Sequence, residues 1–357
     1  MENAIANLTE PNQDDVGVSF MSFVRLMFRH FSMYVSPIVI CSGIVGNFLS
    51  IVVFIKRRKQ DRASAQYLGL LAVVDFLNLS VFTLRDWLHL NLHILSQGRL
   101  SYDKLMPSAV GCKFQLYIWN ILSYCSSWII ICFSVERLLV IWFPLKMAPI
   151  FSSSKPRRRA LGIIVLVAFI MYLPDFHWTT LRALAPEHPE KQTCIWREDI
   201  SRLEVTIYVV LMIVFINNGL PCILITFLNV LILIGIFHNK MESNKSNSKT
   251  DMRCVRNLLL VSSFYFAFML PFCIAWSIYY IAEANGFHGY SPQAARELGE
   301  VALYASTLTF MNYAINPLLY TLSLDFYRAE CKRLFYCMFE KIWETWENVR
   351  QSSPCGT

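Results

Sequence analysis

Polar residues that could act as a switch lie inside the last long apolar stretch of the sequence. The segment Asn316–Tyr320 reads Asn-Pro-Leu-Leu-Tyr, and Asn312 lies about one helical turn before it. Inside a membrane every backbone group has to be satisfied internally, yet a proline leaves one helical carbonyl without its donor. Polar groups at that depth usually face other helices and carry function. We therefore expect Asn316, Pro317 and Tyr320 to form a segment that bends or switches.

Charged residues inside two earlier apolar stretches could also do chemistry. Glu136 and Arg137 are adjacent near the end of one stretch, where a desolvated ion pair could be released by a small rearrangement. Asp75 is a lone carboxylate in the middle of another stretch, so it needs a partner or a proton. The alternatives are that the Glu-Arg pair is only a snorkelling anchor and that Asp75 is a buried neutral acid.

The sequence offers no comparable set of residues for hydrolytic or transport chemistry. A membrane hydrolase needs a nucleophile with its base, or a metal cluster, at one depth. The histidines are scattered and show no His-Glu-x-x-His-like spacing. A transporter usually has internal repeats and discontinuous spans in both halves, and neither is evident. A transporter or a membrane enzyme is therefore the least favoured class.

The elements that must position these residues are membrane-spanning helices. The 357 residues are 55% hydrophobic and 16% charged, whereas a soluble domain carries about 25% charged residues. Apolar runs near the roughly 20 residues that cross a bilayer predict spans at 34–56, 65–90, 108–142, 158–178, 203–238, 252–283 and 296–321. The predicted fold is an all-α seven-transmembrane helix bundle. Its expected parts are an extracellular N-terminal tail (1–33), the bundle (34–321), a short amphipathic eighth helix on the membrane surface (322–340) and a cytoplasmic tail (341–357).

Charge distribution orients this bundle. Basic residues follow the first, third, fifth and seventh predicted spans, and the alternate loops are poorer in them. Positive residues mark the cytoplasmic side, so the N-terminus is expected outside and the C-terminus inside. The net charge of +7 then reflects topology beside anionic lipid, and we expect no nucleic-acid partner.

Cysteines and a glycosylation sequon agree with this orientation. Of the 11 cysteines, only Cys112 and Cys194 are predicted to face the oxidising outside, so we expect them to form a disulfide bond. Asn7 begins an Asn-Leu-Thr sequon in the predicted outer tail and is the glycosylation candidate. Cys331 and Cys337 lie on the predicted amphipathic helix, where each could carry a palmitoyl chain or stay unmodified.

The ordered set of motifs resembles the rhodopsin-like (class A) G-protein-coupled receptors. Each motif is weak alone, but the set occupies almost every predicted span. In chain order the motifs are Gly46-Asn47, Leu71–Asp75, Val135–Leu145, Pro221, Pro271 and Asn316–Tyr320.

The resemblance implies a role for each matching residue at the cytoplasmic side. Arg137 would sit beside Glu136 at rest and face a heterotrimeric G protein when the bundle opens, and Tyr320 would help to hold the open state. The inner-loop residues that would contact the G protein are Ile141, Pro144 and Leu145.

The resemblance also implies a polar core that holds water and, in many members, a sodium ion. The matching residues are Asn47, Asp75, Ser126, Asn312 and Asn316. Sodium at Asp75 is the only metal or cofactor expected.

The outer parts of the predicted spans carry polar and aromatic residues that could meet a ligand. The candidates are Arg85, Asp86, Gln115, Trp119, Asn120, Met269, Glu283, Glu300 and Tyr304. Mixed charge with aromatic rings suits a peptide, although such residues are also common at a membrane interface. Trp119 stands where amine receptors have an acid, and Phe310 where visual pigments have a lysine, so the resemblance argues against amines and retinal.

Departures from the usual family pattern affect the activation relay rather than the fold. Met269 replaces the usual aromatic residue of span six, Asn229 replaces a tyrosine of span five, and Leu138 stands where a tyrosine often follows the arginine. These changes suggest a similarity to invertebrate FMRFamide-type neuropeptide receptors. The predicted function is a plasma-membrane receptor, not an enzyme, that binds an extracellular neuropeptide and activates a heterotrimeric G protein. The alternative is a chemosensory receptor of the same fold for a small molecule.

Overall fold

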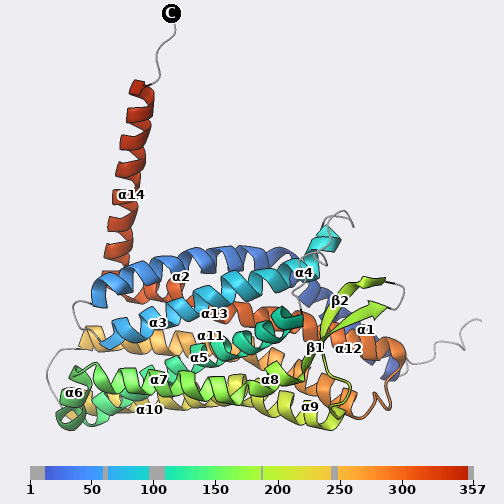
Figure 1. The fold of residues 1–357 in the computed structure, drawn as a ribbon. Coiled ribbons are helices and arrows are strands. Elements are labelled where there is room, and N and C mark those ends of the chain that lie inside the picture. Colours follow the sequence, from blue (N-terminus) through green and yellow to red (C-terminus); the bar gives the residue numbers. More distant parts are fainter. Residues whose placement is uncertain (1–12, 59–62, 96–108, 186–187, 243–247, 353–357) are drawn as a thin grey trace, which may run out of the picture.

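Long helices run side by side along one axis in the computed structural model, and a β-hairpin covers one end of them (Figure 1). The structure describes residues 13–58, 63–95, 109–185, 188–242 and 248–352. In the first half of the chain the elements are α1 (Gln13–His30), η1 (Phe31–Val35), α2 (Ser36–Arg58), α3 (Ala63–Leu77), η2 (Asn78–Thr83), α4 (Leu84–Leu95), α5 (Ala109–Trp142), α6 (Pro144–Ser152), α7 (Lys155–Met171) and α8 (Leu173–Trp178).

The second half begins with the antiparallel hairpin and continues with three helical rods and a final helix. The elements are β1 (Thr179–Ala185), β2 (His188–Trp196), α9 (Arg202–Tyr208), η4 (Val209–Gly219), α10 (Leu220–Glu242), α11 (Ser248–Ala284), α12 (Pro292–Ala305), η5 (Ser306–Leu308), α13 (Thr309–Ser323) and α14 (Asp325–Ser352).

Hydrophobic length confirms the predicted bundle. Six helical rods in the described part of the chain are long and apolar enough to cross a membrane: Ser22–Lys56, Ala65–Leu88, Val110–Trp142, Lys155–Trp178, Arg202–His238 and Ser263–Ala284. The seventh predicted span corresponds to α12, η5 and α13, which follow one another without a break. This rod is not one of those six, because a short 3₁₀ turn at η5 interrupts its α-helix and α12 contains charged residues.

Two helices extend beyond the predicted boundaries. The first rod begins at Gln13, within the stretch expected as an extracellular tail, because Val24 and Phe28 of α1 pack on the outer part of α12. The eighth helix, expected over 322–340, runs from Asp325 to Ser352.

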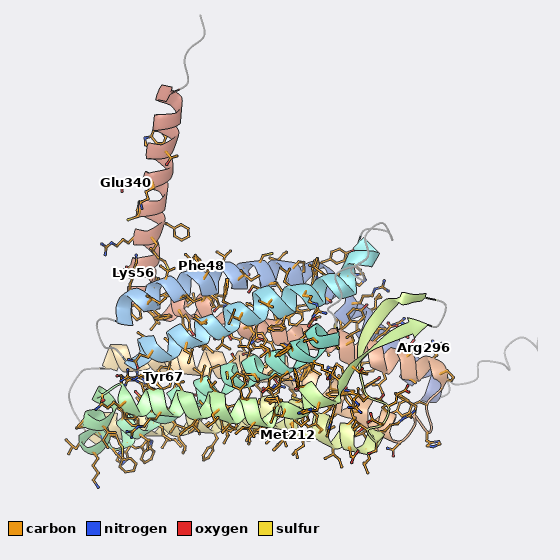
Figure 2. All side chains as sticks on the ribbon, viewed as in Figure 1. Phe48, Lys56, Tyr67, Met212, Arg296 and Glu340 are labelled. Atoms are coloured by element: carbon orange, nitrogen blue, oxygen red, sulfur yellow. The ribbon has the colours of Figure 1, made fainter. Side chains whose placement is uncertain are left out.

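The bundle has two distinguishable ends. We call the end with α6 and the start of α14 the inner end (Figure 1), because the basic last turn of α2 and the basic first turn of α7 lie there. The hairpin, α9 and α12 lie at the opposite, outer end. Figure 2 labels Lys56 and Tyr67 toward the inner end and Arg296 at the outer end. The α14 helix leaves the bundle across its long axis, as a helix on the membrane surface would (Figure 1).

Glycines allow α2 to approach α13 closely. A Cβ atom added at Gly43 would lie 2.6 Å from Ala314 Cβ and 2.9 Å from Ala314 Cα. A Cβ atom at Gly46 would lie 2.8 Å from Pro317 Cβ. Small residues at helix interfaces permit such close backbone contact inside a membrane. The two glycines therefore bring the first rod against the segment that holds Asn316 and Pro317.

We expect Gly43→Ala to lower the melting temperature and the surface expression of the protein. The added methyl group meets backbone as well as side chain of Ala314, so relief requires α2 to move, at a cost of about 1–3 kcal/mol. Gly162→Ala on α7 is the matched control, because nothing lies within 4 Å of its added Cβ. Thermal unfolding of the two purified variants tests the contact, and equal melting temperatures would contradict it.

Candidate functional site

At the inner end of α5 the buried Glu136 carboxylate pairs with Arg157 of α7. Arg157 Nη1 lies 3.5 Å from Glu136 Oε1, and the two side chains are only 0% and 4% exposed. Arg157 occupies the first turn of α7, where Pro156 costs no helical hydrogen bond. The resemblance had implied a resting contact between Glu136 and Arg137. In the described residues the ion pair instead joins α5 to α7, because the first turn of α7 places the buried guanidinium of Arg157 beside the carboxylate.

The Arg137 side chain has no acidic partner in the part of the chain that the structure describes. Its guanidinium carbon lies 5.0 Å from the centre of the Phe133 ring, in a cation–π arrangement. Its Nε atom is buried and makes no hydrogen bond within the same described ranges. The guanidinium therefore has no acidic partner to give up within the described residues when an acceptor comes to it from the inner side.

Apolar side chains lie exposed where α5 gives way to α6. Leu145 is 92% exposed, and Phe143 is 52% exposed. Pro144 is also exposed, whereas Ile141 packs partly against Ile232 of α10. Of the three predicted contact residues, two therefore lie open at the inner end and one belongs to the packing that supports them. An exposed apolar group at this place is typical of a contact surface for a partner.

In the α13 segment, Tyr320 lies among aromatic rings, whereas Asn316 belongs to the polar core around Asp75. Tyr320 is 2% exposed, and its ring lies edge-on against Phe54 at 5.5 Å. It also lies 5.8 Å from the ring of Tyr327 on α14. The Tyr320 hydroxyl has no hydrogen-bond partner in the described structure. A buried hydroxyl without a partner is costly, so a movement that gives it one is favoured.

The predicted polar core is partly assembled around Asp75. Ser126 Oγ donates to Asp75 Oδ1 at 2.6 Å, and Asn316 Nδ2 donates to Asp75 Oδ2 at 2.7 Å. The Asn312 carbonyl accepts a longer contact of 3.5 Å from the same Asn316 nitrogen. Asn47 instead donates to the backbone carbonyls of Gly43 and Tyr313, at 3.0 and 2.9 Å. The structure thus joins α3, α5 and α13 at Asp75, while Asn47 links α2 to α13.

A cavity of about 900 Å³ opens at the outer end, between the loop after β2 and helices α9, α11 and α12. One face of α11 supplies Trp276, Tyr279, Tyr280 and Glu283 at helical spacing. The acidic lining residues are Glu198, Glu283 and Glu300, and the basic ones are Arg197, Arg202 and Arg296. The cavity therefore offers both signs of charge beside aromatic rings.

Ion pairs hold two of the charged groups beside this cavity. Arg197 makes two hydrogen bonds to Asp199, at 2.9 and 2.5 Å, and they hold the pKa of Asp199 below its usual range. Arg25 of α1 lies 3.4 Å from Glu300. Both of these pairs are partly exposed to solvent, so each contributes little to stability. A charged ligand could therefore exchange with them.

The nine predicted ligand residues do not form one site. Glu283 and Glu300 line the cavity. Gln115 donates to Asp86 at 3.4 Å between α5 and α4, next to Arg85, and Asn120 donates to Asp175 at 2.8 Å. Met269 belongs to the apolar core, Tyr304 is buried in α12, and the indole nitrogen of Trp119 is buried without a partner in the described ranges.

Most of the cavity lining was not among those nine residues. The repeat of Trp276, Tyr279 and Tyr280 with Glu283 was a usable signal, because residues at that spacing share one helical face. The lining residues of α9 and of the loop after β2 show no sequence pattern that predicts a cavity, since their positions depend on how the hairpin folds over the bundle.

The sequence also predicted a disulfide bond, one glycosylation site and two palmitoylation sites. Cys112 is fully buried and disulfide-bonded, and its sulfur lies 3.6 Å from the Thr180 carbonyl oxygen of β1. Cys194 lies on β2 opposite Leu181, but its side chain is outside the described residues, so the pairing stays a prediction. Asn7 also lies outside the described residues.

Cys331 and Cys337 on α14 differ in their surroundings. Cys331 packs against the cluster around Tyr327, and burial raises the pKa of its thiol. Cys337 is exposed. The thiolate is the nucleophile in cysteine chemistry, so the exposed Cys337 is better suited to acylation. Palmitoylation of either residue stays a prediction.

Comparisons with known proteins show which sequences resemble this chain. The family model described as 7 transmembrane receptor (rhodopsin family) matches residues 46–320. Neuromedin-U receptor 2 of Homo sapiens is 24% identical over 329 residues, which are 88% of this chain and 74% of that protein. Galanin receptor type 1 of Mus musculus is 24% identical over 352 residues, with 94% and 92% covered. The neuropeptide S receptor of Mus musculus is 24% identical over 303 residues, with 81% and 75% covered.

Proposed function

This chain belongs to the rhodopsin family of seven-transmembrane receptors, and we propose that it binds an extracellular neuropeptide and activates a heterotrimeric G protein. Members of the family are multi-pass plasma-membrane receptors and not enzymes. The observation that carries the proposal is the outer-end cavity, which mixes carboxylates, guanidinium groups and aromatic rings. One helix, α11, lines that cavity and continues to the inner end, so it connects a ligand to the G-protein side.

The chemistry of the cavity favours a peptide over a small apolar molecule. A volume of about 900 Å³ lies near the upper end of the roughly 300–1,000 Å³ usual for ligand pockets. Glu283 and Glu300 suit a guanidinium or ammonium group, and Arg202 and Arg296 suit a carboxylate or a carbonyl. Trp276 and Tyr279 offer ring faces for an aromatic side chain.

An amidated peptide with an arginine and an aromatic residue near its end suits these groups, because its guanidinium meets the carboxylates, its carbonyls meet the arginines and its ring packs on the aromatic side chains. Such a ligand is consistent with the resemblance to FMRFamide-type receptors. The relatives named for neuromedin-U, galanin and neuropeptide S are peptide receptors, and they support the same ligand class.

The proposed mechanism is a shift between two populations of the bundle. The peptide binds better to the state in which the inner end of α11 has moved outward, and its differential affinity moves the equilibrium. Pro271 weakens the helical hydrogen bonding of α11 between the cavity and the inner end, so the helix can bend there. The opened inner end then exposes Arg137 to the G protein, and Tyr320 leaves its aromatic surroundings to help hold this state.

The polar core fits the sodium ion that the family implies. Asp75 is fully buried, and its two oxygens accept only from the neutral Ser126 and Asn316 among the described residues. Oxygen donors are the ligands that hard cations prefer. Asp75, Ser126 and Asn312 would supply them, and the ion would stabilise the closed bundle by neutralising the buried carboxylate.

We expect sodium chloride to weaken agonist binding to the wild-type receptor and to have no such effect on Asp75→Asn. Competition binding in sodium chloride against choline chloride of equal strength measures the effect. Equal sodium sensitivity of the two receptors would exclude an ion at Asp75.

A ligand screen tests the proposed function. Cells that express the full chain are exposed to amidated neuropeptides while calcium and cyclic AMP are recorded, with Arg137→Ala at matched surface level as the control. An active peptide is then compared with its citrulline analogue, in which the guanidinium charge is removed. We expect the analogue to be about tenfold or more weaker, as for loss of a charge-assisted hydrogen bond. A response to a small molecule alone would instead favour the chemosensory alternative.

A further inference from the structure

Among the described residues of the inner end, Arg157 is the most deeply buried basic side chain. The residue is 1% exposed, and it lies in the first turn of α7. Its Nε donates to Gln66 Oε1 of α3 at 3.1 Å, and its Nη1 donates to the Phe151 carbonyl of α6 at 2.6 Å. The same Nη1 lies 3.5 Å from Glu136 of α5. One guanidinium therefore joins α3, α5, α6 and α7.

This arrangement gives Glu136 Oε1 a cationic partner other than its sequence neighbour, while Oε2 has no hydrogen-bond partner among the described residues. A guanidinium carries several donors in a rigid plane, so it can hold a carboxylate, an amide and a carbonyl at once. The Tyr67 side chain, which Figure 2 labels toward the inner end, adds a polar group beside Glu136. Arg137 consequently rests on the Phe133 ring and makes no ion pair within the described ranges.

We propose that Arg157 is a positioning residue for G-protein coupling, which keeps Arg137 unpaired by holding the Glu136 carboxylate on the side of α7. The inference rests on the proposed function of the chain. Arg157 has a second effect through Phe151, because it fixes the α6 helix that presents Pro144 and Leu145. A receptor without Arg157 has a buried carboxylate with no cation, and Arg137 is the adjacent one that can turn to it.

Removal and rescue test this role. Arg157→Ala is expected to keep peptide affinity and to lose about tenfold or more in signalling potency at matched surface level, as for loss of a charged hydrogen bond. Adding Glu136→Gln removes the carboxylate that would capture Arg137, so Glu136→Gln/Arg157→Ala is expected to regain at least threefold of the loss. The matched control is Arg158→Ala, an exposed arginine next in sequence, with wild-type signalling.

The rescue separates positioning from folding, since the double variant lacks the Arg157 side chain as much as the single one does. A double variant that signals as poorly as Arg157→Ala would overturn the inference, and so would wild-type potency in Arg157→Ala itself. If Arg157→Ala fails to reach the surface, Arg157→Lys takes its place and should show a smaller loss with the same rescue. Failure of the wild-type chain to signal at all would refute the proposed function, and the inference with it.

Discussion

The Arg137→Ala receptor is expected to reach the cell surface, to bind the proposed peptide with wild-type affinity and to lose most of its G-protein activation. The guanidinium is partly enclosed, rests on Phe133 and makes no ion pair among the described residues, so its removal breaks no structural contact of consequence. The proposed contact with the G protein, in contrast, loses a charged donor. Loss of one or two charge-assisted hydrogen bonds predicts a fall on the order of 10- to 100-fold in activation.

Concentration–response curves at equal surface expression measure this loss, with radioligand binding as the check on the outer cavity. Arg159→Ala is the control for charge alone, because that side chain is exposed on α7 at the same end of the bundle. Unchanged second-messenger output from Arg137→Ala would count directly against its role.

The Cys112→Ser receptor is expected to show strongly reduced surface expression or peptide affinity. Cys112 is a fully buried disulfide cysteine near the outer start of α5, where β1 lies against it. The hairpin ends at Trp196 and is followed by Arg197, and both residues line the cavity. Loss of a native disulfide costs about 2–5 kcal/mol, so we expect both the hairpin and the cavity to lose their shape.

Cys41→Ser is the matched control, since Cys41 is a free, exposed cysteine on α2. Treatment with a reducing agent should impair binding by the wild-type receptor and by Cys41→Ser to the same degree. Normal expression and affinity of Cys112→Ser would show that the bond is dispensable, and an intact bond in Cys194→Ser would show that the predicted partner is wrong.

Hydrophobic length predicted the spanning helices well, because a run of apolar residues near membrane thickness has few other uses. The N-terminal helix was harder to predict from the sequence. Its helical state depends on α12, where Ser22 donates to Glu297 at 2.9 Å and Arg25 meets Glu300. A contact between residues that lie so far apart in the chain leaves no local signal.

Hydrogen-bond and ion-pair partners within the site could be predicted where a sequence motif specifies them, but not where they depend on how the helices pack. The resemblance placed Asp75, Ser126 and Asn316 together, and the structure joins them by hydrogen bonds. The resemblance implied that Arg137 is the resting partner of Glu136, but the turn through α6 brings Arg157 to the carboxylate instead. Helical spacing identifies which residues share a face, but packing decides whether that face meets a cavity. Asp86 and Glu283 were both predicted to bind the ligand, yet Glu283 lines the cavity and Asp86 contacts Gln115 instead.

Nucleotide exchange on a purified G protein tests the central claim most directly. The receptor is reconstituted in lipid vesicles with the active peptide from the screen, and the release of GDP is followed for wild type and Arg137→Ala. We predict that the peptide accelerates release by wild type and leaves release by Arg137→Ala at the basal rate. No acceleration on any G protein with any ligand, together with movement of a solute across the vesicle membrane, would contradict the account.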